Sequence, residues 1–150
     1  MNLNGKQQLE GQPEQIWDLL QDPETLASIM PGCEELIQEG EDQYKGVIKA
    51  KIGPVSSTYN AGFKIEDKTP PTSYRLLVDG QGPGGFVNGD VKIELEGNEE
   101  GTMLHYSGTA KVGGKIASIG QRLVESGAKL IIKQGFKALR KEVSKKVSEA

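Results

Sequence analysis

Six runs of alternating apolar and polar residues fill the middle of the sequence. They cover residues 34–40, 43–52, 56–67, 73–80, 86–96 and 101–112. Alternation with period two is typical of strands that have one face in the core and the other in solvent. The segments between the runs are short and contain Gly, Pro or charged residues, which favours tight turns between antiparallel neighbours. The pattern therefore predicts an antiparallel sheet built as a meander.

Helical signals flank this region on both sides. A strand over residues 2–9 is followed by two short helices, over residues 13–20 and 22–30, and Asp22 is suited to cap the second. A long helix is predicted from Lys115 to Lys146. This order predicts an α+β fold in which the long helix crosses one face of a curled sheet. The length of 150 residues suits a single domain, residues 1–150.

The inward face of the predicted sheet contains many small residues. We assign alternate residues of each run to opposite faces of the sheet. This assignment places all four tyrosines on the inward face, together with Gly46, Ala50, Ala61, Gly80, Gly89, Gly108 and Ala110. It places no Asp, Glu, His, Lys or Arg there. A solid core of normal density needs larger side chains at several of these positions. The pattern therefore predicts an apolar cavity behind the sheet.

The long helix contains glycine at positions 120, 127 and 135. Each helical glycine costs about 0.5–1 kcal/mol relative to alanine. At about 100° per residue, two or three of these glycines fall on the buried side of the helix. Two interpretations stay open: the missing side chains leave room for a ligand, or they let the helix and the sheet approach each other closely.

The last turns of the helix are basic. Residues 129–150 contain seven Lys or Arg and two Glu, for a net charge of +5, whereas the whole chain has −3. A second apolar line runs through Ile132, Phe136, Leu139, Val143 and Val147. The helix end, about residues 137–150, is expected to project as a basic amphipathic segment that contacts an anionic membrane or a partner. The alternative is that this line packs on the two short helices.

The sequence offers no motif for catalysis or metal binding. The segment GQGPGG at 80–85 matches a dinucleotide-binding pattern, but a strand follows it where a helix is required. We interpret it as a mobile loop at the pocket mouth, with Phe86 in contact with the ligand. The single histidine, His105, falls on the outer face, and the single cysteine, Cys33, follows a helix end. We therefore expect no enzymatic activity, no metal site and no bound cofactor.

Four segments carry a resemblance to a known family. They are DPETLASIMPGCEEL at 22–36, IGPVSSTYNAGFKI at 52–65, DGQGPGGFVNGD at 79–90 and GTAKVGGKIASIGQRLVESGAK at 108–129. Together they resemble the CoxG-like family of carbon monoxide dehydrogenase subunits, which is part of the START/Bet v 1-like (SRPBCC) superfamily. The resemblance implies a helix-grip fold, a curved antiparallel sheet of about seven strands around a long C-terminal helix with a cavity between them. It also implies association with molybdenum-containing carbon monoxide dehydrogenases, and no catalytic residue.

Phasing and resemblance together define the candidate site residues. The residues predicted to line the cavity and bind the ligand are Tyr44, Ile48, Tyr59, Ala61, Phe63, Tyr74, Leu76, Val78, Phe86, Val91, Tyr106, Gly108, Ala110, Ile116, Gly120, Leu123, Gly127 and Ile131. The residues predicted to contact a membrane or a partner are Lys133, Phe136, Lys137, Arg140, Lys141 and Val143. The substitutions Gly108→Leu and Gly127→Leu are expected to fill the cavity without disturbing the fold.

Three functions stay open. The first, which the resemblance implies, is a non-catalytic protein that binds a quinone or another lipid. It assists membrane recruitment or electron-acceptor coupling of a molybdenum enzyme of the carbon monoxide dehydrogenase type. The second is an assembly or maturation partner of that enzyme that uses no ligand, and the third is a cyclase or hydrolase like others in the superfamily.

Charge and hydropathy limit the partners and the cellular location that we expect for the protein. The net charge of −3 argues against nucleic acid as a partner. The first residues lack the apolar core of a signal peptide, and no apolar run is long enough to span a bilayer. We therefore expect a cytoplasmic protein, peripheral at the inner face of the cell membrane if the basic helix end binds lipid.

Overall fold

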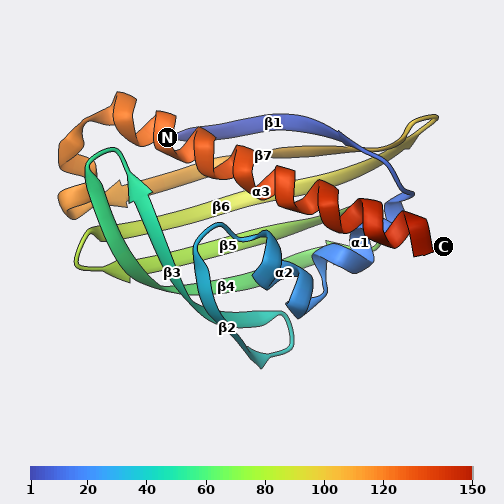
Figure 1. The fold of residues 1–150 in the computed structure, drawn as a ribbon, viewed down its shortest axis with the longest axis horizontal. Helices are drawn as coiled ribbons and strands as arrows, with labels where there is room; N and C mark the ends of the chain where they lie inside the picture. Colours follow the sequence, from blue (N-terminus) through green and yellow to red (C-terminus); the bar gives the residue numbers. More distant parts are fainter. Residues whose placement is uncertain (150) are drawn as a thin grey trace.

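The computed structural model describes residues 1–149 and contains a continuous antiparallel sheet (Figure 1). Within these residues, the seven strands are β1 (Asn2–Leu9), β2 (Cys33–Gly40), β3 (Gln43–Ile52), β4 (Val55–Thr69), β5 (Ser73–Gly82), β6 (Gly85–Asn98) and β7 (Gly101–Gly113). Their order across the sheet is β1-β7-β6-β5-β4-β3-β2. The predicted meander is confirmed, and β1 pairs with β7 at the end of it.

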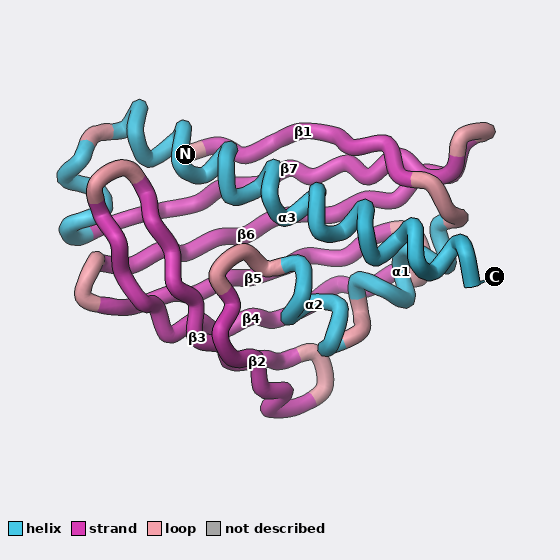
Figure 2. Tube along the Cα trace, in the orientation of Figure 1, coloured by secondary structure: helices cyan, strands magenta, loops and turns pink. Residues whose placement is uncertain are grey.

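Helices cover one face of this sheet (Figure 2). They are α1 (Pro13–Leu20), α2 (Pro23–Ile29), the 3₁₀ helix η1 (Gly114–Ile119) and α3 (Gln121–Glu149). The Asp22 carboxylate accepts a hydrogen bond of 3.1 Å from the Thr25 N–H, so Asp22 caps α2 as predicted. The 29 residues of α3 extend for about 43 Å, and Figure 1 shows them crossing the curved sheet. This arrangement confirms the predicted α+β fold.

The long helix begins later than the sequence predicts. Residues 114–119 form η1, and α3 starts only after Gly120, which has φ +99°. This backbone conformation favours glycine and ends regular helix geometry. Upstream, the Ile116 N–H donates to the Gly84 carbonyl at 2.8 Å, which fixes η1 to another part of the chain. Gly120 is therefore a joint between two helices, not a glycine within one.

The turn between β5 and β6 is held on two sides. The Gly84 N–H donates to Ser57 Oγ at 3.0 Å, and the Gly84 carbonyl accepts from Ile116. A Cβ built on Gly85 would lie 2.0 Å from the Gly113 carbonyl oxygen, so the two glycine-containing segments are in backbone contact. The interpretation of residues 80–85 as a mobile loop is wrong, because these contacts fasten the turn to β4, β7 and η1.

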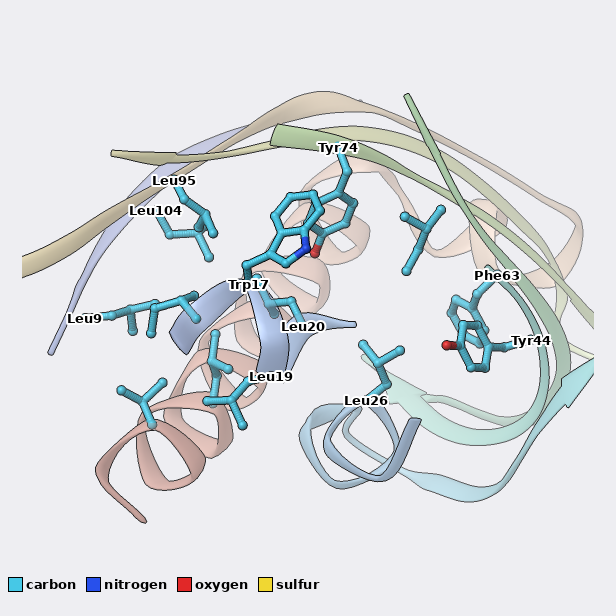
Figure 3. Packing of buried hydrophobic residues seen from close by; sticks show 14 of the residues in the cluster. Leu9, Trp17, Leu19, Leu20, Leu26, Tyr44, Phe63, Tyr74, Leu95 and Leu104 are labelled. Carbon is cyan, nitrogen blue, oxygen red and sulfur yellow. The ribbon is translucent and has the colours of Figure 1, made fainter. Parts of the chain in front are cut away.

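The main core lies between the sheet, the two short helices and the C-terminal half of α3 (Figure 3). Its most deeply buried members are Leu9, Ile16, Leu104, Leu139 and Val143. Leu139 is 2% exposed and Val143 is 1% exposed. The end of α3 also bonds to β1 and the segment after it, since Arg140 donates to Gln7 and Ser144 to Glu10. The helix end thus packs on the protein, as in the alternative interpretation, and does not project.

Candidate functional site

The strand register fixes which residues meet across the inner face of the sheet, the face that α3 covers. One cross-strand row contains Gly46, Ala61, Gly80, Val87 and Val112. The next row contains Tyr44, Phe63, Val78, Gly89 and Ala110. The row after that contains Ile65, Leu76, Val91, Gly108 and Leu3. The small residues therefore form a diagonal band that keeps the centre of the sheet free of bulky side chains.

Two packed clusters close the inner face at its ends. The main core fills one end, and a second cluster around Ile52, Tyr59 and Ile116 fills the end near η1. Beside the main core lies a strip of apolar residues that are only half-buried: Ile48, Leu76, Val78, Val91 and Ile93. All of them except Val91 pack against the edge of that core. We call these five residues the central strip. Because apolar side chains that keep accessible surface in a concave face are typical of ligand sites, the central strip is the candidate binding surface.

The structure divides the predicted cavity lining into three groups. The fully buried group comprises Tyr44, Tyr59, Ala61, Phe63, Tyr74, Ala110 and Ile116. The half-buried group, on the inner face or on the side of α3 toward it, comprises Ile48, Leu76, Val78, Val91, Tyr106, Gly108, Gly127 and Ile131. The group outside the inner face comprises Phe86, Gly120 and Leu123. The ligand-binding role of the first two groups stays a prediction.

The prediction is wrong for the third group. Phe86 has the phase of the outer face, and its ring covers Gly113, where a built Cβ would lie 2.2 Å from Phe86 Cε1. Gly120 precedes α3, and no atom lies within 4 Å of a Cβ built on it. Leu123 is 46% exposed, because the buried side of α3 begins at the next residue, Val124, which is turned by about 100°.

The surroundings of Gly127 in α3 decide whether its missing side chain leaves room for a ligand or lets the helix approach the sheet closely. A Cβ built on Gly127 would lie 2.7 Å from Ile52 Cγ2, which is too short for any real contact, so Gly127 lets α3 approach β3 closely. On the sheet, a Cβ on Gly108 would lie 2.0 Å from the Asp90 carbonyl oxygen. The expectation that Gly108→Leu and Gly127→Leu preserve the fold is therefore wrong, because both positions are already in tight contact.

Surface hollows lie at the edge of the inner face and on the outer face. A hollow of about 410 Å³ between β7 and the start of α3 is lined by Ala110, Val112 and Val124 together with polar Gln121 and Glu125. It reaches the inner face, because Ala110 and Val112 have the inward phase. Two other hollows, of about 460 and 820 Å³, are lined mainly by outer-face residues. His105 lines the larger of these, which confirms its predicted outward position.

Tyrosine hydroxyls supply the polarity of the inner face. Burial raises the pKa of Tyr44, Tyr59 and Tyr74 above the ordinary value of 10, most strongly for Tyr74. All three phenols are therefore neutral at neutral pH. The inward positions of β3 to β7 carry no acidic or basic side chain. Neutral phenols in apolar walls suit hydrogen bonding to a ligand, whereas general acid–base catalysis needs groups that titrate near neutral pH.

The predicted contact residues on α3 separate into two sets. Lys133, Lys137, Arg140 and Lys141 are exposed. The other two face inward: Val143 is in the main core, and the Phe136 ring stacks on Tyr106 with centroids 5.4 Å apart. For Phe136 and Val143 the predicted surface contact is therefore wrong, because the apolar line that contains them packs on the sheet and α1. The role of the four basic residues stays a prediction.

Sequence reasoning missed one residue of the outward side of α3. Leu130 is 55% exposed and lies two turns after Leu123, so both leucines are on the same, largely exposed side of the helix. Leu123 and Leu130 are seven residues apart, and each directly precedes a residue of the buried side, Val124 or Ile131. This spacing is the sequence feature that identifies them. The outward side of α3 therefore combines exposed leucines with lysines and arginines.

Neither a cluster of metal ligands nor a membrane-spanning helix is found among residues 1–149. No three His, Cys, Asp or Glu side chains of this part of the chain are grouped so that they could share a metal ion. Over the same residues, no helix has both the length and the apolar character needed to cross a membrane.

The model of the CoxG family, named for a subunit of carbon monoxide dehydrogenase, matches residues 5–144. The chain belongs to this family. A crystal structure of a conserved protein from Geobacillus kaustophilus is 42% identical to this CoxG-family chain, with a TM-score of 0.92 over 97% of this chain and 96% of that one. No curated protein matches the chain.

More distant structures share the fold of this CoxG-family protein. A START superfamily protein from Mycobacterium smegmatis has 12% identity and a TM-score of 0.75 over 96% of this chain and 97% of that one. The Zhui aromatase/cyclase from Streptomyces sp. R1128 has 12% identity and a TM-score of 0.69 over 98% of this chain and 95% of that one. At this identity the likeness is one of fold alone, and it confirms the predicted helix-grip architecture.

Proposed function

We propose that this CoxG-family protein is a non-catalytic binding protein for a quinone or a similar lipid. In this proposal it helps a molybdenum enzyme of the carbon monoxide dehydrogenase type reach the cytoplasmic face of the membrane or its electron acceptor. The observation that carries the proposal is the central strip, an apolar surface left half-buried at the edge of the main core. Membership of a family named for a dehydrogenase subunit supports an accessory role.

The chemistry of the inner face favours a lipophilic ligand. Covering apolar surface stabilises a complex by about 25 cal/mol per Å², whereas a charged ligand would lose its hydration next to walls that carry no opposite charge. A cyclase or hydrolase would need an inward acid or base, and the inward positions of β3 to β7 offer neutral hydroxyls instead. The enzyme alternative therefore has less support than the binding function.

Uptake of a short-chain ubiquinone tests this function. We expect protein purified without detergent to bind one equivalent, because the proposal places a single binding surface, the central strip, on the inner face. Native mass spectrometry measures the bound mass, and organic extraction identifies any lipid carried from the cell. A protein that releases no lipid and takes up no quinone would contradict the proposal. A complex with the apo-dehydrogenase that resists salt would then favour the assembly-partner alternative.

The outward side of α3 supports the membrane part of the proposal. Lys137 and Lys141 are exposed there, on the same side as Leu130. Basic residues near an anionic bilayer contribute about 1 kcal/mol each. The double variant Lys137→Ala/Lys141→Ala is therefore expected to bind vesicles containing phosphatidylserine about 30-fold more weakly in a flotation assay.

A matched control separates local contact from net charge. The double variant Lys64→Ala/Lys92→Ala removes the same charge from exposed positions on the outer face of the sheet. It is expected to bind the vesicles as the wild type does. Equal losses in the two double variants would show that α3 has no special role in lipid contact.

A further inference from the structure

Two polar side-chain groups lie deep in the apolar interior, where α1 meets β5. Tyr74 is 4% exposed and Trp17 is 7% exposed. Their rings meet edge to face, with centroids 5.5 Å apart and an interplanar angle of 87°. Figure 3 shows the phenol extending from the sheet toward α1 and the indole extending from α1 toward the sheet. The ring contact therefore places the hydroxyl and the indole N–H in the same part of the interior.

Neither group has a hydrogen-bond partner among residues 1–149. Burial alone raises the pKa of Tyr74, with no contribution from a hydrogen bond. Tyr59 differs, because a hydrogen bond to Ser57 partly offsets the effect of burial on its pKa. Leaving a buried donor unpaired is unfavourable, so buried Tyr and Trp side chains usually have a hydrogen-bond partner for their polar group.

Both polar atoms also border open space. Some buried side-chain nitrogen and oxygen atoms have neither solvent contact nor a hydrogen-bond partner. Among residues 1–149, these atoms are the amide nitrogen and oxygen of Gln21 alone. The Tyr74 hydroxyl and the Trp17 indole nitrogen are unpaired and are not in that group, so each keeps some accessible surface. A water molecule can therefore touch each of these two atoms.

Aromatic and apolar side chains surround this pair. Directly across from Tyr74 on β6 is Ile93 of the central strip, and the next residue in the same row is Tyr106 on β7. Tyr106 stacks on Phe136 of α3. Two aromatic pairs thus stand at either side of a half-buried isoleucine, and aromatic walls favour planar ligands.

Building on the proposed function, we infer that the Tyr74 hydroxyl and the Trp17 indole N–H form a polar anchor that holds a neutral, planar ligand by a carbonyl oxygen. An indole N–H can only donate, and a tyrosine hydroxyl can donate as well, so one oxygen with two lone pairs satisfies both. A carboxylate is a poor occupant, because no cation at the inward positions of β3 to β7 compensates its desolvation.

Two probes of nearly equal shape test the anchor. Menadione has two carbonyl groups on a methylnaphthalene ring, and 2-methylnaphthalene has none. By isothermal titration, we expect the wild type to bind menadione more tightly than the hydrocarbon. Tyr74→Phe is expected to weaken menadione binding about tenfold and to leave the affinity for 2-methylnaphthalene unchanged. Trp17 is the one tryptophan of the chain, so quenching of its fluorescence by menadione reports occupancy at the anchor itself.

The stability of the variant separates binding from folding. Because the Tyr74 hydroxyl has no partner to lose, Tyr74→Phe is expected to melt at the wild-type temperature or above it. Wild-type affinity of Tyr74→Phe for menadione would overturn the anchor, with a buried water as the natural partner of the two groups. Failure of the wild type to bind either probe would overturn the proposed function and the anchor together, whereas binding of both probes with equal affinity would overturn the anchor alone.

Discussion

Replacing Gly32 with alanine is expected to lower the free energy of unfolding by more than about 4 kcal/mol. Gly32 has φ +78°, and a Cβ built on it would lie 1.9 Å from the Lys49 carbonyl oxygen. The clash involves backbone that cannot move aside, because the Lys49 N–H donates to the Gly32 carbonyl at 2.8 Å. The substitution therefore has to separate the end of α2 from β3. Urea denaturation followed by circular dichroism measures the change.

Gly40 provides the control for this prediction. It lies at the other end of β2, and no atom is within 4 Å of a Cβ built on it. Gly40→Ala is expected to change the free energy of unfolding by less than about 0.5 kcal/mol. Similar stability of the two variants would mean that the contact between Gly32 and Lys49 is not a fixed part of the folded state.

Gly89→Leu is expected to abolish ligand binding and preserve the fold. Gly89 has the inward phase, between Val78 and Ala110, and a Cβ built on it would meet Val78 Cβ at an ordinary distance of 3.7 Å. The remaining atoms of a leucine would extend over the central strip, in the space that we propose for the ligand. We expect at least about a 100-fold loss of affinity for a short-chain ubiquinone, with a change in unfolding free energy within about 1 kcal/mol.

Gly62→Leu adds the same side chain on the other face of the sheet. A Cβ on Gly62 would meet only the Asp79 carbonyl oxygen, at 4.0 Å, and its phase is outward. This variant is expected to keep both its affinity and its stability. Unchanged quinone affinity in Gly89→Leu would place the binding surface elsewhere, and an equal loss in both variants would point to a general effect of leucine on the sheet.

The strands were predictable because their signal is local. Alternation with period two fixes both the existence of a strand and the face of each residue, and the register confirms the inward positions from Tyr44 to Val112. The start of α3 was not predictable in this way. Lys115 and Ile116 continue a helical pattern, but a hydrogen bond from Ile116 to Gly84, far away in the sequence, holds them in η1.

The candidate site was predictable as a face but not residue by residue. Glycine in a sequence indicates that a side chain is missing, without indicating what occupies the position. Gly127 and Gly108 have neighbours at contact distance, whereas Gly89 has room, and only the packing distinguishes them. The sequence of α3 contains two apolar lines and does not show which of them is buried. In the folded protein α1 covers Leu139 and Val143, and so buries the second line.

The pairing of β1 with β7 has a consequence for the order of assembly during synthesis. The sheet partner of β1 is the last strand of the meander: the Met1 amine donates to the Ala110 carbonyl, 109 positions later in the sequence. Strand pairs between residues this far apart in the sequence form late in folding. On the ribosome, Leu9 and the apolar side of α1 therefore stay without their native partners until β7 and then α3 emerge. Chaperones that bind exposed apolar segments would therefore find their target at Leu9 and the apolar side of α1.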